Sequence, residues 1–285
     1  MLPDGQRPRL VVLDFDGTFT DVEAEAGPFY TAFRKDARAL LGEDFEADWS
    51  QAQATIAENP GMHGWLHDGR IVAPGNADPY LRATVIMNMI FDARGMFADL
   101  EQRSATLQRL YHDNYPKADT VFRPEAKEVV EALLAADVPT WVVTNSATEH
   151  VQKKIDRLAP RGRESLRVIG NARKFVVTEP QRRDARFDAV PETMQVEGLS
   201  RPIYPRRGHY FDVLEGIWGE TGTQPQETLV AGDIFELDLV LPAALGGEVV
   251  LVTKPRTADF EKTGCAALDR GSVADDLHAV LTRLS

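Results

Sequence analysis

Cysteine is almost missing from this sequence, which contains a single one, Cys265, in 285 residues. One cysteine can neither close an internal disulfide nor supply a cysteine-rich metal site. The chain must therefore be held together by its hydrophobic core, and 285 residues suffice for a large α/β domain with a smaller accessory unit. We interpret the lone thiol as a bystander in a reducing compartment.

Long hydrophobic runs are missing as well. No stretch approaches the roughly eighteen apolar residues that a membrane-spanning helix needs. The pattern of a secretory leader is not seen either, because residues 1–9 are polar and the apolar run Leu10 to Leu13 ends at Asp14. We therefore expect a cytoplasmic protein without a membrane partner.

Positive charge is in deficit. The chain has 32 Lys and Arg against 44 Asp and Glu, a formal net charge of −12. A surface for nucleic acid or anionic lipid needs a basic stripe, so we expect neither as a partner. An anionic ligand would have to meet a local positive patch or a bound cation.

Strands and helices alternate along most of the sequence. The apolar run at residues 9–13 is rich in β-formers and stops at a polar cluster, as a buried parallel strand does. After a helix opened by Pro124, we expect strands at residues 139–143, 166–169, 228–231 and 249–252, and helices at residues 147–158, 210–219, 239–245 and 273–284. This order predicts an α/β fold with a doubly wound, parallel, Rossmann-like sheet, whose ligand crevice lies at the carboxyl ends of the strands.

A second, smaller domain interrupts this pattern. Residues 21–115 show helical periods throughout, with at most a short strand at residues 69–73. We expect an all-helical cap domain there, inserted into a core domain made of residues 1–20 and 116–285. Residues 171–207 are less regular, and their strand-like stretches at 174–178 and 194–196 indicate a β-hairpin or flap.

Three polar clusters follow the ends of predicted strands. They are Asp14-Phe15-Asp16-Gly17-Thr18, Thr144-Asn145-Ser146, and the segment from Gly232 and Asp233 to Asp238. In a parallel sheet all three meet at one edge. Crowded carboxylates repel one another and are costly to desolvate, so they call for a cation. Mg²⁺ fits, because it prefers carboxylate and water oxygens and binds phosphates through a partly hydrated shell.

These motifs resemble those of the haloacid dehalogenase superfamily in its phosphotransferase branch. The first motif there is D-x-D-G-T, as at Asp14 to Thr18. The second is a Thr or Ser after a later strand, as at Thr144, and the fourth is Gly-Asp with a further Asp, as at Asp233 and Asp238. The inserted helical segment falls where this superfamily places a cap, and the resemblance covers residues 9 to about 255.

The resemblance implies a role for each matched residue. Asp14 would be the nucleophile that takes the phosphoryl group, and Asp16 would protonate the leaving alcohol and then deprotonate water. Mg²⁺ would be held by the carboxylates of Asp14 and Asp233 and by the backbone carbonyl of Asp16, with Asp238 supporting it directly or through water. The phosphoryl oxygens would be bound around Thr144, Asn145 and Gly17.

The third motif of the superfamily, a lysine beside the nucleophile, has two candidate positions. Lys174 is the only lysine between Leu158 and Leu229 and follows a predicted core strand closely. The other position, before the helix that leads to the fourth motif, holds Arg206 and Arg207 in place of a lysine. We favour Lys174 as the catalytic cation and expect the two arginines to bind distal parts of the substrate.

These implications predict a phosphatase that hydrolyses a small phosphorylated metabolite through an aspartyl-phosphate intermediate with Mg²⁺. Hydrolytic dehalogenation needs neither Asp16 nor Asp233. A phosphomutase or another phosphotransferase shares the core motifs and stays open, as does a catalytically silent protein that uses the fold for binding. Neither the substrate nor the oligomeric state can be read from the sequence.

Overall fold

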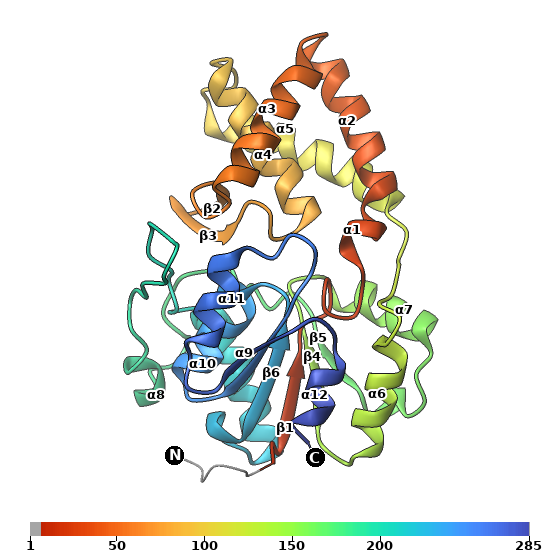
Figure 1. Ribbon diagram of the computed structural model, residues 1–285, viewed down its shortest axis with the longest axis vertical. Helices are drawn as coiled ribbons and strands as arrows, with labels where there is room; N and C mark the ends of the chain where they lie inside the picture. Colours follow the sequence, from red (N-terminus) through yellow and green to blue (C-terminus); the bar gives the residue numbers. More distant parts are fainter. Residues whose placement is uncertain (1–6, 285) are drawn as a thin grey trace. The chain divides into compact units, whose positions relative to one another are not determined.

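The computed structural model describes residues 7–284 (Figure 1). The chain divides into two compact units. The core unit comprises the described residues up to Thr20 together with those from Phe122 onward, and the accessory unit is Asp21–Val121. The chain thus re-enters the core unit at Phe122, after a short 3-10 helix, η1 (Tyr115–Lys117), rather than at residue 116.

The core unit contains a parallel sheet, six-stranded in the described residues, with the order β5-β4-β1-β6-β7-β8. The strands are β1 (Leu10–Leu13), β4 (Thr140–Val143), β5 (Arg167–Ile169), β6 (Thr228–Gly232), β7 (Glu248–Val252) and β8 (Gly271–Ala274). Central β1 pairs with both β4 and β6, for example Val11 with Thr140 and Leu229. The predicted α/β fold is confirmed, and its parallel order brings the ends of β1, β4 and β6 to one edge.

Alternation along the central strand places a hydrophobic core on each face of the sheet. Leu10 and Val12 belong to one core and Val11 and Leu13 to the other, and all four are buried. The first core is covered by α9 (Gly208–Thr221), α10 (Val240–Ala244) and α11 (Asp259–Ala266). The second is covered by α6 (Ala126–Ala135), α7 (Thr148–Leu158) and α12 (His278–Thr282).

The accessory unit has a core of its own, rich in aromatic side chains such as Phe29, Phe33 and Trp49. Its helices are α1 (Val22–Glu25), α2 (Gly27–Leu41), α3 (Phe45–Glu58), α4 (Pro79–Ala93) and α5 (Leu100–Asn114). The Asp78 carboxylate caps α4 by accepting from the Leu81 N–H at 2.9 Å. The unit is not all-helical as expected, because β2 (Gly64–His67) and β3 (Arg70–Pro74) form an antiparallel hairpin.

Two stretches of the core unit differ from their predictions. The segment 171–207 contains no β-hairpin. It holds a short helix, α8 (Ala185–Asp188), and two isolated bridges, Thr178 with Arg207 and Met194 with Ile203. The final predicted helix is divided, because residues 271–274 form edge strand β8 and only α12 is helical. Helix α11 was not predicted.

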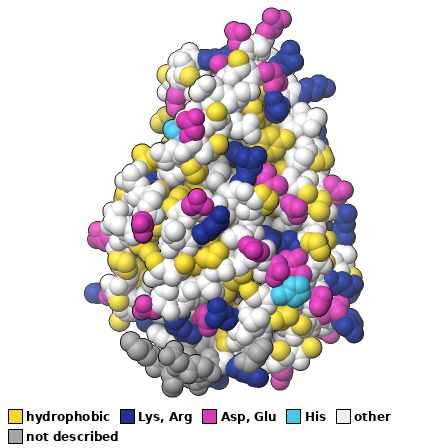
Figure 2. Space-filling view, in the orientation of Figure 1, with side chains coloured by type: hydrophobic (Ala, Val, Ile, Leu, Met, Phe, Trp, Pro, Cys, Tyr) yellow, Lys and Arg dark blue, Asp and Glu magenta, His cyan; other side chains and the backbone are white. Residues whose placement is uncertain are grey.

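Acidic and basic side chains are interspersed over the face drawn in Figure 2. Among the described helices, none combines the length and the apolar character that a membrane span demands.

Candidate active site

The site is built around Asp14, which follows central strand β1 directly. The Asp14 N–H donates to the Ala231 carbonyl of β6 at 2.8 Å, so the strand pairing fixes the backbone of this residue. Thr144 follows β4 and Asp233 follows β6. The sheet order therefore brings the three predicted motifs together at the carboxyl ends of β1, β4 and β6.

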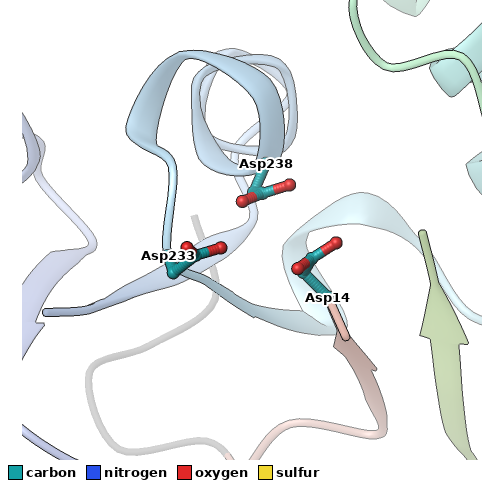
Figure 3. Close-up of side chains that lie close together, drawn as sticks. All are labelled: Asp14, Asp233 and Asp238. Carbon is teal, nitrogen blue, oxygen red and sulfur yellow. The ribbon is translucent and has the colours of Figure 1, made fainter. Parts of the chain in front are cut away.

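Three carboxylates meet at this edge. Asp14, Asp233 and Asp238 each offer an oxygen within 4.8 Å of the others, and all three side chains are buried. Figure 3 shows them converging from the end of β1 and from the turn after β6. That turn is π-helical, η4 (Phe235–Leu239), and Asp238 closes it by accepting from the Ile234 N–H at 3.0 Å.

Lys174 is the cation beside Asp14. Its Nζ donates to Asp14 Oδ1 at 2.7 Å and to Asp238 Oδ1 at 2.8 Å, and the residue is only 1% exposed. Its backbone is held on both sides, because its N–H donates to Asn145 Oδ1 at 2.8 Å and its carbonyl accepts from Arg207 at 3.3 Å. Of the two candidate positions for the third motif, Lys174 is the one in contact with Asp14.

The charges of this cluster shift the pKa values of its members. Burial raises the pKa of Asp14 well above its usual range; the Lys174 ammonium opposes this, and Asp238 and Asp233 add to it. Burial alone would lower the pKa of Lys174, but attraction by Asp14 and Asp238 outweighs burial and raises it. The neighbouring carboxylates thus act upward on the pKa of both Asp14 and Lys174, and this concentration of negative charge favours a further cation.

Asp16 is held by two groups that were not predicted. The Ser146 hydroxyl donates to Asp16 Oδ2 at 2.6 Å, and Lys154 Nζ of α7 donates to Asp16 Oδ1 at 3.0 Å. Its carboxylate is not part of the three-carboxylate group of the described residues. Ser146 belonged to the second polar cluster of the sequence, but no local pattern singled out Lys154, whose partner is 138 residues away.

Thr144 and Asn145 shape the neighbouring loops. The Thr144 hydroxyl accepts from the Ser146 N–H at 3.1 Å, and its carbonyl accepts from the Ala172 N–H at 2.9 Å. Asn145 positions Lys174 as described above. Gly17 lies against Asp233, and Arg123 Nε donates to the Gly17 carbonyl at 3.0 Å.

The two arginines that were expected to bind substrate are engaged elsewhere. Arg206 forms an ion pair with Glu179 at 2.7 Å, lies over the Phe187 ring and donates to the Phe187 and Val190 carbonyls. Arg207 is fully buried, its Nε donates to the Tyr204 carbonyl at 2.7 Å, and burial lowers its pKa to about 10. In the described structure these arginines support the 171–207 segment and the Lys174 backbone. That they also bind distal parts of the substrate stays a prediction.

Lys254 is a further residue of this edge that no sequence pattern indicated. It follows β7, and its ammonium forms an ion pair with Asp233 Oδ2. Glu261 of α11, a buried carboxylate, accepts from the Phe235 and Ala258 N–H groups at 3.2 and 3.1 Å. Glu236 is bound by Arg201, which ties residue 201 to the turn that carries Asp238.

The donor set at this edge suits a hard divalent cation. Three carboxylates supply oxygen ligands within 4.8 Å of one another, the spacing over which a single ion is bound. Neither thiol nor imidazole belongs to the group, so the residues fit Mg²⁺ better than a softer metal.

The chain matches a known protein family and shares its fold with solved structures. The family model for haloacid dehalogenase-like hydrolases matches residues 8–184. Comparison with curated proteins gave no match. Among solved structures, the chain is similar in fold to a predicted phosphoglycolate phosphatase of Haemophilus somnus 129PT (TM-score 0.57, 15% identity, 99% of this chain and 100% of that one). It is also similar to the HAD-hydrolase YfnB of Bacillus subtilis, bound to magnesium (TM-score 0.52, 13% identity, 98% and 99% covered). With the family model covering more than half of its length, the chain belongs to the haloacid dehalogenase-like hydrolases.

Proposed function

We propose that this protein is a Mg²⁺-dependent phosphatase that hydrolyses small phosphorylated metabolites through an aspartyl-phosphate on Asp14. The observation that carries the proposal is the buried group of Asp14, Asp233 and Asp238, with Lys174 donating to Asp14 at 2.7 Å. A hydrolytic dehalogenase needs the nucleophile but not two further carboxylates beside it. Membership of the hydrolase family and a fold shared with phosphatases add support.

Charge balance favours a phosphoryl group as the reacting centre. A dianionic ester is repelled by three carboxylates unless cations offset them. Lys174 offsets part of this charge. When bound by Asp14, Asp233 and Asp238, Mg²⁺ would polarise the phosphoryl oxygens and offset their charge.

The residues of the chain divide the reaction into two displacements. In the first, an oxygen of Asp14 attacks phosphorus, the phosphorus–oxygen ester bond breaks, and Asp16 gives its proton to the leaving oxygen. In the second, water attacks phosphorus, Asp16 takes the proton of this water, and the bond between Asp14 and phosphorus breaks. Ser146 and Lys154 each contact one Asp16 oxygen and so fix the position of this carboxyl between the two displacements.

The nucleophile is tested by Asp14→Asn. This change removes the attacking charge and keeps the shape, so hydrolysis of p-nitrophenyl phosphate should fall by at least about a thousandfold while the circular dichroism spectrum stays unchanged. EDTA should abolish the activity of the wild-type enzyme, and added Mg²⁺ should restore that activity. Asp259→Asn serves as the matched control, because the Asp259 side chain is 98% exposed.

Two results would contradict the proposal. Activity of Asp14→Asn within tenfold of wild type corresponds to a loss of only about 1.4 kcal/mol, too small for a covalent nucleophile. Halide release from a small 2-haloacid that persists in EDTA, with no phosphate released from any ester of a metabolite panel, would identify a dehalogenase instead.

A further inference from the structure

Each carboxylate of the candidate metal site is in contact with a lysine. Lys174 binds Asp14 and Asp238, and Lys254 binds Asp233. Three carboxylates and two ammonium groups leave a net charge of −1 to attract a divalent cation. The mechanism proposed above uses Lys174 at the nucleophile and gives no role to Lys254.

The backbone and the side chain of Lys254 are both held in place by neighbouring groups. It follows β7, and its backbone N–H donates to Thr257 Oγ1 at 2.9 Å, which closes the turn after that strand. Its side chain is 4% exposed and that of Asp233 is 1% exposed, so water screens this ion pair weakly. A surface lysine would not bring its charge to bear on the site in this way.

We propose that Lys254 is an internal cation that competes with the divalent metal for Asp233 and thereby sets the metal affinity of the site. This inference rests on the proposed metal-dependent function. An ammonium and a metal ion that shared the Asp233 carboxylate would be held close together by it. Two cations on one carboxylate repel each other, and each reduces the negative charge that the carboxylate offers to the other.

Glu261 is a second carboxyl group whose charge interacts with the same lysine. Burial raises the pKa of Glu261, attraction by Lys254 opposes this rise, and the resulting pKa is about 7. Glu261 is anchored by the Phe235 and Ala258 N–H groups, so its position does not depend on Lys254. When ionised, Glu261 therefore still attracts the ammonium while a metal ion draws on Asp233, which lowers the cost of competition at this buried site.

The test is the affinity of the full-length protein for metal alone. Binding of Mn²⁺ is followed by electron paramagnetic resonance of the free ion, and binding of Mg²⁺ by calorimetry. Lys254→Met and Lys254→Gln should each bind Mn²⁺ at least about tenfold more tightly than wild type, since both remove the competing charge. Lys254→Arg keeps the charge and should stay within about threefold. Lys262→Met removes the same charge from a side chain that is 44% exposed and should leave the affinity unchanged.

The outcomes separate this inference from the proposed function. If wild type binds neither Mn²⁺ nor Mg²⁺, the metal site itself is wrong and the inference is overturned with it. If wild type binds metal but the Met and Gln variants bind equally or more weakly, Lys254 supports the site and does not compete for it. Should the Met variant not fold, the Gln variant decides, because its amide still donates a hydrogen bond to Asp233.

Discussion

Gly17 is a residue at which backbone conformation and site geometry constrain each other. Its φ is +89°, and a Cβ built there would lie 2.1 Å from Asp233 Oδ2. Any side chain would therefore displace a carboxylate of the candidate metal site in addition to straining the backbone. The family resemblance implied phosphoryl oxygens near Gly17, which stays a prediction, and the structure places the Asp233 carboxylate against this residue.

Lys174 and its two partners yield a sharp prediction at the same scale. Lys174→Met should lower kcat by about a hundredfold or more for every phosphate ester tested, because it removes the positive charge that contacts Asp14. It should also lower the free energy of unfolding by about 3–5 kcal/mol in EDTA, since removing one partner leaves buried carboxylates unpaired. Steady-state kinetics and urea denaturation measure the two effects.

Arg206→Met provides the comparison for Lys174→Met. Arg206 lies on the same segment but pairs with Glu179, so kcat should stay within about threefold. A variant set in which Arg206 is essential for all esters and Lys174 is dispensable would refute the placement of the third motif at Lys174.

The three lysines of the site show which residues a sequence can reveal. Lys174 was predictable because it was the only lysine in the interval that follows a core strand. Lys154 lies on an amphipathic helix and Lys254 in a turn, positions where lysine is ordinary. Their partners, Asp16 and Asp233, come from other elements, so only the folded chain brings each pair together.

At the scale of elements, buried strands were predicted well and partly polar ones were not. Strands β1, β4 and β6 read as short apolar runs because both of their faces are buried. Edge strand β8 carries Gly271 and Ser272 and leaves Val273 37% exposed, so it has no apolar run to detect. The 171–207 segment depends on isolated bridges and on side chains that bind distant carbonyls, such as Arg206, which leave no periodic pattern.

The contact between α11 and the turn η4 makes stability depend on pH. Glu261 joins the two elements, and its pKa rises on folding from an ordinary 4.5 to about 7. The folded protein therefore binds more protons between these pH values, and its free energy of unfolding falls as pH rises through that window. Glu261→Gln removes this dependence. Between pH 5 and pH 8 the free energy of unfolding of the variant should therefore rise by about 2–3 kcal/mol relative to that of wild type. Urea denaturation at both pH values measures the gain.

Glu197→Gln is the matched control for this titration. Glu197 is exposed, and the difference between this variant and wild type should not change with pH. A Glu261→Gln profile that runs parallel to wild type from pH 5 to pH 8 would show that Glu261 titrates in its ordinary range.

At the scale of the whole molecule, the two ends of the accessory unit lie side by side, where the backbone that enters the unit pairs with the backbone that leaves it. Thr20 and Phe122 form an antiparallel bridge, and the Asp21 N–H donates to the Val121 carbonyl at 2.8 Å. The two units have separate hydrophobic cores, with Phe29 and Trp49 in one and the sheet residues in the other. This arrangement is typical of an inserted domain, and it implies that the core unit can fold without the insert.

Replacing residues 21–121 by the dipeptide Asn-Gly tests this independence. Antiparallel neighbours can be joined by a two-residue type I′ turn, so the shortened chain should close at Thr20 and Phe122 without strain. It should unfold cooperatively in urea and bind Mn²⁺ within about tenfold of the full-length protein, because Asp14, Asp233, Asp238 and Lys174 all belong to the core unit. Turnover should lose its preference among phosphorylated metabolites, since the cap implied by the family resemblance would be gone. A shortened chain that folds cooperatively yet has lost Mn²⁺ binding would show that the accessory unit contributes to the metal site, and one that fails to fold would show that the core depends on its insert.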